Sequence, residues 1–250
     1  MKEPSRVIIT GATSGIGRAL AIKFAKHGHR VGVTGRREDR LLQLREQFPD
    51  QIVVLAQDLA KRESIIPGLE ELKTQLGGLD LFVANAGTSR RDLSLPLENE
   101  LEVLDVNVVG FVTTLNWAMQ CFKRQGHGHL VGMSSVAAFW GNMYNPMYNA
   151  TKAFEMNYMR GLREHLREYG IPVTDVRPGF VATEMTEQNE HMFAVATPEK
   201  AAKQIYAAII KRREIVYITK RWRYISWIMR MTPNIIYRKL AHLNKPGKQS

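Results

Sequence analysis

One cysteine, Cys121, occurs among the 250 residues, so an internal disulfide is excluded and a reducing compartment is expected. Long apolar runs are also missing, since no stretch approaches the about 18 residues that a membrane-spanning helix needs. A strand pattern already begins at Arg6, which leaves no room for a secretory signal. We therefore expect a cytoplasmic protein.

Acidic residues are scarce at one end of the chain. Residues 1–210 carry 24 Lys/Arg and 23 Asp/Glu, whereas residues 211–250 carry 11 Lys/Arg and a single acid, Glu214. The net charge of +11 therefore belongs to the C-terminal tail. A nearly neutral body argues against a nucleic-acid partner. The seven histidines form no metal-ligand pattern, so we expect no metal.

Short β-branched runs alternate with helical patterns along the chain. The strand patterns cover 6–10, 30–34, 51–56, 79–84, 128–134, 171–176 and 214–218, and the helical patterns cover 15–28, 37–48, 60–76, 98–125, 146–169 and 198–211. Strands that are apolar almost throughout are typical of a parallel sheet covered on both faces. The sequence predicts an α/β fold, with a single doubly wound Rossmann-type domain and a mostly parallel seven-stranded sheet at 1–219. A basic amphipathic helical C-terminal extension is predicted at 220–250.

A glycine-rich turn follows the first strand and opens the first helix. It reads Thr10-Gly11-Ala12-Thr13-Ser14-Gly15-Ile16-Gly17. Glycines let the backbone approach a pyrophosphate, which then lies at the N-terminus of the helix. Many such matches are ordinary turns, but the position between a strand and a helix favours a dinucleotide site.

Tyr148 and Lys152 lie four residues apart in a helical pattern, so their side chains share one face. A nearby cation favours the phenolate, and the pair could exchange protons at a carbonyl or alcohol carbon near neutral pH. Ser135 lies thirteen residues before the tyrosine. Chance supplies roughly half a Tyr-x-x-x-Lys pair in a chain of this composition, so the rest of the chain must build a site around it.

Taken in order, the motifs resemble those of the short-chain dehydrogenase/reductase family, whose nucleotide motif reads Thr-Gly-x-x-x-Gly-x-Gly. The other matching signals are Asp58-Leu59 after the third strand, Asn85-Ala86-Gly87 after the fourth, Asn107 within Asn-x-x-Gly, Ser135 after the fifth strand, Tyr148-x-x-x-Lys152, and Pro178-Gly179-x-x-x-Thr183 after the sixth. The resemblance covers about residues 5–218. It implies an oxidoreductase that works as a homodimer or homotetramer.

The resemblance also implies roles for these residues. Tyr148 would be the general acid/base at the substrate oxygen, and Lys152 would lower the pKa of the tyrosine and hold the nicotinamide ribose. Ser135 would hydrogen-bond the substrate oxygen, and Asn107 would hold a water behind the lysine. The predicted catalytic residues are Asn107, Ser135, Tyr148 and Lys152. The predicted cofactor-binding residues are Gly11, Thr13, Ser14, Gly15, Ile16, Gly17, Arg36, Arg37, Asp58, Leu59, Asn85, Ala86, Gly87, Tyr148, Lys152, Pro178, Gly179, Val181 and Thr183.

Some of these residues have simpler interpretations. Asn85 could be a structural hydrogen bonder, and Asp58 could cap the helix that follows it. Ser134 neighbours Ser135, but alternation along a strand places the two on opposite faces. Tyr144 has no lysine four residues later, so we interpret it as a pocket-wall aromatic.

The end of the second strand bears on the choice of cofactor. Sites that prefer NAD place an acid there to bind the ribose 2′-hydroxyl, whereas this chain has Gly35-Arg36-Arg37. Two guanidiniums could pair with a 2′-phosphate, so we predict NADP(H). Ser14 stands where some NADP-dependent relatives have a basic residue, which counts against the prediction.

Apolar residues surround the predicted site. Phe139, Trp140, Met143, Tyr144, Phe180, Met185, Met192 and Phe193 would make an adaptable pocket wall, although some of them will be core or interface contacts. The predicted substrate-binding residues are Ser135, Trp140, Tyr144 and Tyr148. We expect a hydrophobic carbonyl or alcohol substrate and an NADP(H)-dependent oxidoreductase. The alternative is a catalytically idle NADP(H)-binding sensor or scaffold, which would not need to retain the four catalytic residues together.

The C-terminal tail predicts two basic amphipathic helices. In the first, from Trp222 to Met231, Arg223, Ser226 and Arg230 share a narrow arc, and Thr232-Pro233 then starts the second. Such helices are typical of an interfacial membrane anchor, which would make the protein peripheral at a membrane surface. They could equally pack on the body, cover the pocket or form a subunit interface, and contact with nucleic acid is the least favoured alternative.

Overall fold

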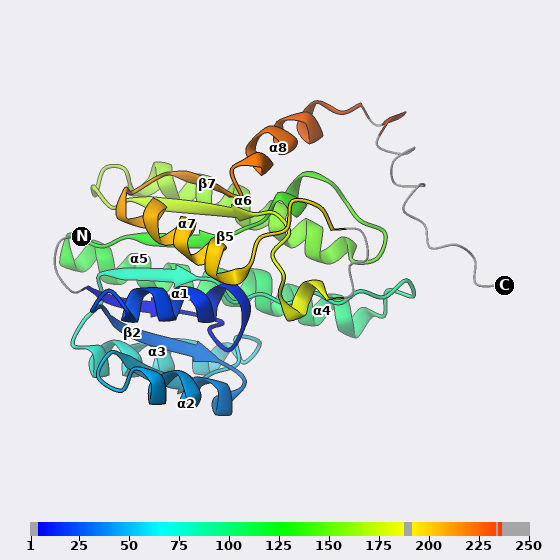
Figure 1. Ribbon diagram of the computed structural model, residues 1–250. Coiled ribbons are helices and arrows are strands. Elements are labelled where there is room, and N and C mark those ends of the chain that lie inside the picture. The colour runs from blue at the N-terminus through cyan, green and yellow to red at the C-terminus, as the bar shows by residue number, and fades with distance from the viewer. Residues whose placement is uncertain (1–4, 188–191, 234, 237–250) are drawn as a thin grey trace.

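A sheet of seven parallel strands forms the centre of the molecule (Figure 1). The computed structural model describes residues 5–187, 192–233 and 235–236. The strand order is β3-β2-β1-β4-β5-β6-β7. The strands are β1 (Arg6–Ile9), β2 (Arg30–Gly35), β3 (Ile52–Ala56), β4 (Leu81–Ala84), β5 (Leu130–Met133), β6 (Val173–Pro178) and β7 (Ile215–Ile218).

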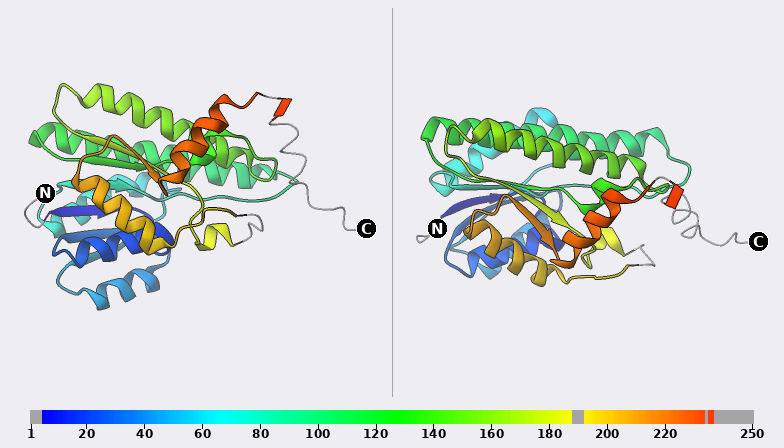
Figure 2. Two further views of the ribbon diagram at one scale, coloured as in Figure 1. Left: turned by 45° about the horizontal axis from the view of Figure 1, so that its top comes forward. Right: turned by 90° about the horizontal axis from the view of Figure 1, so that it is seen from above.

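Helices connect the strands and cover both faces of the sheet (Figure 2). They are α1 (Gly15–Ala25), α2 (Glu38–Gln47), α3 (Arg62–Leu76), α4 (Leu97–Leu104), α5 (Phe111–Gln125), α6 (Pro146–Leu166), α7 (Pro198–Ile210) and α8 (Arg221–Met231), with the short helical segments η1 (Asp105–Gly110), η2 (Val136–Phe139) and η3 (Glu184–Thr186). Thr197 is the N-cap of α7, because its side chain accepts from the backbone N of Lys200 at 3.2 Å.

Two apolar cores lie on opposite faces of the sheet. One packs α1, α2 and α7 on the strands through residues such as Leu20, Leu44 and Ile205. The other packs α3, α5 and α6 through residues such as Leu69 and Phe122. Burial on both faces explains why the strands are apolar almost throughout. The predicted doubly wound fold is confirmed, and the sheet is parallel along its whole width.

The strand order changes direction between β1 and β4, which are neighbours in the sheet but not in the chain. The connections run outward from β1 to β3 on one side and from β4 to β7 on the other. At such a switch point the loops diverge, and a crevice opens beyond the carboxyl ends of the strands. Every sequence motif described above lies at this edge or on a helix next to it.

The segment predicted as one helix over 98–125 is interrupted. The chain is α-helical in α4, continues as the π-helix η1, and becomes α-helical again in α5. A π-helical turn accommodates an extra residue and often marks a functional site. Asn107 lies within η1 and is fully buried.

The tail leaves the sheet after β7, and α8 begins at Arg221 (Figure 1). The second predicted tail helix, after Pro233, falls largely outside the described residues. Within the described part of the chain, the helices are too short or too polar to cross a membrane.

Candidate active site

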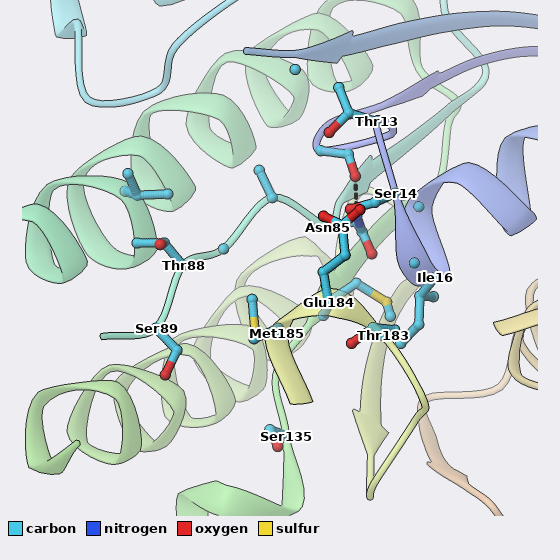
Figure 3. A pocket seen from close by; sticks show the side chains of 18 of the residues that line it. Thr13, Ser14, Ile16, Asn85, Thr88, Ser89, Ser135, Thr183, Glu184 and Met185 are labelled. Atoms are coloured by element: carbon cyan, nitrogen blue, oxygen red, sulfur yellow. Dashed lines mark hydrogen bonds between the residues drawn. The ribbon is translucent and has the colours of Figure 1, made fainter. Parts of the chain in front are cut away.

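A cavity of about 550 Å³ opens at the carboxyl edge of the sheet, within the about 300–1,000 Å³ that small-molecule sites occupy. Its walls come from the turn before α1, from the ends of β2 to β6, from α6 and from η3. Figure 3 shows the labelled side chains of Thr13, Ser14 and Ile16 across from Thr88 and Ser89, with Thr183, Glu184 and Met185 beside them.

The glycine turn lines the cavity and packs closely on the end of β4. Gly11 has a φ of +69°, and a Cβ there would lie 2.7 Å from Ala86 Cα. Asn85 Nδ2 donates to the carbonyl oxygens of Thr10 and Gly11, both at 3.0 Å, which ties the turn to the end of β4. Asn85 is therefore a structural hydrogen bonder, which was one of the two interpretations that the sequence allowed. The first N–H groups of α1 lie at this turn, where an anion can satisfy them.

A substitution in this turn should weaken cofactor binding without unfolding the protein. A Cβ at Gly17 would lie 2.3 Å from the Gly11 oxygen and 2.4 Å from Asn85 Nδ2. Overpacking of this kind costs about 1–3 kcal/mol, so we expect Gly17→Ala to raise the Kd for NADPH by about 10–100-fold, measured by fluorescence titration. Gly161→Ala is the control, because a Cβ at Gly161 would meet no atom of the described residues within 4 Å, and this variant should bind NADPH normally. Equal affinity of both variants would contradict this account of the turn.

Ser135, Tyr148 and Lys152 all line the cavity. Lys152 Nζ lies 5.6 Å from the centre of the Tyr148 ring. Ser135 Oγ accepts from the Ala137 backbone N at 3.1 Å and donates to the Pro178 oxygen at 3.3 Å. The neighbouring Ser134 instead donates to Asp175 Oδ1 at 2.5 Å, as the alternation along the strand predicts. The structure therefore brings the predicted trio together beside the glycine turn.

Lys152 is held by a buried carboxylate that was not among the predicted site residues. Lys152 Nζ donates to Glu155 Oε1 and Oε2 at 3.0 and 2.8 Å and to the Met133 oxygen at 3.1 Å. Burial raises the pKa of Glu155 to about 7, although Lys152 acts in the opposite direction. Burial alone would lower the pKa of Lys152, but the charges of Glu155 and Tyr148 outweigh it and the pKa lies above its usual value.

The sequence carries a signal for this acid. Glu155 precedes Met159, Leu162 and Leu166 by four, seven and eleven residues, which is the spacing of the buried stripe of α6. An acid on such a stripe is buried and needs a cation, and Lys152 lies three residues before it.

Asn107 lies behind the cavity wall. Its Oδ1 accepts from the Thr88 backbone N at 2.8 Å, and its Nδ2 donates to the Thr88 oxygen and to Thr151 Oγ1 at 2.9 and 3.1 Å. A Cβ on Gly87 would lie 3.4 Å from both Asn107 Oδ1 and Lys152 Nζ, so the two side chains flank the same residue. Asn107 fixes the strand end beside Lys152, and its predicted water relay stays a prediction.

The two arginines after β2 reach different parts of the cavity. Arg37 Nη2 donates to Thr13 Oγ1 at 3.0 Å and to Ser14 Oγ at 2.8 Å, directly over the glycine turn. Its Nη1 pairs with Glu184 Oε2 at 2.7 Å. Arg36 is more exposed and pairs with Glu102 at 3.4 Å. Both guanidiniums line the cavity, with Arg37 the better placed to meet a phosphate near the turn.

The remaining predicted cofactor residues also line the cavity: Asp58, Leu59, Ala86, Gly87, Pro178, Gly179, Val181 and Thr183. Asp58 Oδ1 accepts from the Ala60 backbone N at 3.1 Å, so it shapes a tight turn, while the N-cap of α3 is Lys61. Thr183 begins η3 in a capping box with Thr186, which also lines the cavity.

Trp140 and Tyr144 lie away from the described cavity wall. Trp140 Nε1 donates to the Met229 oxygen of α8 at 2.9 Å, and the Tyr144 ring lies 4.9 Å from the Arg91 guanidinium. Phe180 and Phe193 pack against Trp222 with ring centres 5.5 and 5.0 Å away. Much of the predicted apolar wall therefore packs against α8, and substrate binding by Trp140 and Tyr144 stays a prediction.

Further polar residues support the cavity without having been predicted. Asp175 is buried under Ser134 and pairs with Arg177 at 2.6 Å, and Arg177 in turn donates to Tyr217 Oη at 2.9 Å. Arg90 and Arg91 line the cavity after β4. Among the described residues, His, Cys, Asp and Glu side chains nowhere gather in a group of three that could hold a metal ion.

Comparisons of the sequence with known proteins match the family that the sequence motifs resemble. The sequence profile described as short chain dehydrogenase matches residues 5–193. An uncharacterized oxidoreductase of Myxococcus xanthus is 38% identical over 187 residues, which cover 73% of this chain and 74% of that one. An NADP-dependent 3-hydroxy acid dehydrogenase, YdfG, of Escherichia coli is 31% identical over 178 residues, or 70% and 72% of the two chains.

Solved structures share the architecture. A serine dehydrogenase complexed with NADP+ matches with a TM-score of 0.77 and 26% identity, covering 85% of this chain and 93% of that chain. A short chain dehydrogenase/reductase from Burkholderia phymatum in complex with NAD has a TM-score of 0.82 over 90% and 92% of the two chains; at 20% identity this match shows the fold alone. The profile match and the relatives together show that the chain belongs to the short chain dehydrogenase family of oxidoreductases.

Proposed function

We propose that the protein is an NADP(H)-dependent oxidoreductase that reduces a hydrophobic carbonyl compound or oxidises the corresponding alcohol. The observation that carries the proposal is the presence of Ser135, Tyr148 and Lys152 in one cavity with the glycine turn. The turn fits a dinucleotide, since its glycines line the cavity and α1 begins there, where the helix N-terminus can bind a pyrophosphate. When bound, the nicotinamide supplies or accepts the hydride.

Three side chains of the protein would bind the substrate oxygen and transfer its proton. Tyr148 Oη donates the proton as the carbonyl oxygen gains charge, and it removes that proton in the reverse direction. Ser135 Oγ hydrogen-bonds the same oxygen and stabilises its developing charge. Lys152 supplies a fixed positive charge beside the Tyr148 ring, where Glu155 and the Met133 oxygen hold its ammonium.

The cofactor preference rests on Arg37, and one substitution tests it. Hydrogen bonds to charged groups contribute about 1.5–3 kcal/mol, so we expect Arg37→Ala to raise the KM for NADPH by about 10–100-fold and to change the KM for NADH little. Arg40→Ala is the matched control, because Arg40 also pairs with Glu184 but does not line the cavity. An equal rise for both cofactors would point to general damage instead of recognition of the 2′-phosphate.

The 3-hydroxy acids are a second substrate class to be assayed. Arg91 lines the cavity and could pair with a carboxylate, whereas the neighbouring Arg90 already pairs with Glu102 at 2.7 Å. One relative is named a 3-hydroxy acid dehydrogenase. The experiment is therefore NADPH oxidation, or NADP+ reduction, against hydrophobic ketones, aldehydes and alcohols and against 3-hydroxy acids. Turnover of the hydrophobic compounds supports the proposal, and turnover of the acids alone favours the second class. Tight NADPH binding with no turnover of any compound would favour the idle sensor or scaffold.

A further inference from the structure

Helix α8 is fixed to the body through its inner face. Trp222 and Ser226 are buried, and the Trp222 indole occupies the space that a side chain on Gly179 would take. Trp140 Nε1 donates to the Met229 oxygen near the other end of the helix, at 2.9 Å. These contacts give α8 one orientation on the body, so its outer face has a definite position.

The outer face carries a stripe of large apolar side chains. Tyr224, Trp227, Ile228 and Met231 are 73, 66, 60 and 67% exposed, and residues three, four and seven positions apart lie on one side of a helix. Single exposed apolar side chains are ordinary, but a contiguous patch marks an interaction site. Figure 1 shows α8 projecting from the body on the side away from α2 and α3.

Cations flank this stripe. Lys220, Arg221 and Arg223 are exposed beside it, whereas the Arg230 guanidinium lies 5.9 Å from the centre of the Phe139 ring of the body. The sequence contains no Asp or Glu from Ile215 to Ser250. A second copy of the chain would bring like charges together if the two stripes met face to face, which is unfavourable. An anionic lipid surface instead offers opposite charge to the arginines and an apolar layer to the stripe.

We propose that α8 docks the protein on the surface of an anionic lipid bilayer, with Tyr224, Trp227, Ile228 and Met231 inserted at the interface and the basic side chains among the headgroups. Trp and Tyr are the side chains that occupy this interface best, because their rings are apolar and their N–H or O–H groups reach water. The docking surface is distinct from the catalytic cavity and does not depend on the proposed activity. Through Trp222 and Gly179 it lies next to the cavity wall.

The test is co-sedimentation of the full-length protein with vesicles. We expect binding to phosphatidylcholine vesicles that contain phosphatidylglycerol, weaker binding to phosphatidylcholine alone, and loss of binding as salt is added. Trp227→Ser/Ile228→Ser should lower the affinity at least about tenfold, since both side chains lose their apolar burial. Arg221→Gln/Arg223→Gln should lower it about tenfold on the anionic vesicles only. All of these variants retain Trp222, so α8 keeps its contacts with the body.

A matched control separates this surface from apolar exposure in general. Leu97 and Leu101 of α4 are also exposed, and Leu97→Ser/Leu101→Ser should bind the vesicles as well as the unmodified protein does. The proposal is overturned if the unmodified protein stays in the supernatant with anionic vesicles, or if Trp227→Ser/Ile228→Ser binds them normally. It is also overturned if that variant turns a dimer into a monomer in analytical ultracentrifugation while vesicle binding is unchanged, since a second copy would then cover the stripe.

Discussion

Replacing Tyr148 by phenylalanine is expected to lower kcat by about 10²–10⁴-fold and to leave the affinity for NADPH nearly unchanged. The change removes one oxygen, the atom that would exchange the proton with the substrate. The ring that lines the cavity beside Lys152 and Ser135 is retained. Initial rates of NADPH oxidation at saturating substrate measure the loss, and a fluorescence titration measures NADPH binding.

Tyr158→Phe is the control for this substitution. Tyr158 lies on the same helix, and its ring stacks on Phe154 at 5.7 Å. We expect its kcat to match that of the unmodified protein. A kcat within tenfold of normal for Tyr148→Phe would mean that another group transfers the proton, and the assignment of Tyr148 as general acid/base would be wrong.

Replacing Lys152 by methionine should abolish turnover and also destabilise the fold. The change leaves the Glu155 carboxyl fully buried without its cation, and breaking a buried pair in this way costs about 3–5 kcal/mol. The loss should grow with pH. Removing the lysine raises the pKa of Glu155 further above about 7, whereas an unfolded glutamate ionises near 4.5. Between these values the folded state binds more protons than the unfolded state, so the free energy of unfolding falls as pH rises from about 5 to 8.

A second substitution separates the structural effect from the catalytic one. Lys152→Met/Glu155→Leu replaces the buried pair by apolar side chains, which is often neutral for stability. We expect this double variant to recover most of the free energy of unfolding and to remain inactive. Its free energy of unfolding should not show the fall between pH 5 and 8 that is expected for Lys152→Met. Urea unfolding followed by circular dichroism at several pH values gives the stabilities.

The exposed pair Glu164–Arg167 on the same helix has the same i, i+3 spacing, and Arg167→Met should cost less than about 1 kcal/mol. If the double variant regained turnover, Lys152 would be no more than the partner of a buried acid. If Lys152→Met were as stable as the unmodified protein at pH 8, the burial of an ionised Glu155 would not be what destabilises it.

The parallel sheet could be predicted from the sequence because its strands are buried on both faces and therefore apolar almost throughout. The cavity could be predicted for a related reason, since parallel strands bring their carboxyl ends to one edge. Gly11, Ser135 and Pro178 are far apart in the chain, yet each lies just at or after a strand end.

Contacts between segments that are far apart in the chain could not be predicted in the same way. Glu155 is not such a case, because the helical period places it on the buried stripe of α6 and places Glu164, nine residues later, on the opposite face. The position of Trp140 depends on α8, nearly ninety residues later in the chain, and no local pattern reports such a contact. The break in the helix predicted over 98–125 was not expected, because a search for apolar residues at the α-helical period cannot detect a change from α-helix to π-helix and back.

That break has a consequence for insertions and deletions. A π-helical turn holds one more residue than an α-helical turn, so removing one residue from Asp105–Gly110 would convert η1 to an α-helix and leave α5 nearly in phase with α4. The apolar side of α5 would stay on the sheet, and the change would fall on the bonds between Asn107 and the Thr88 backbone. We therefore expect a one-residue deletion in η1 to spare the fold and to disturb the strand end beside Lys152.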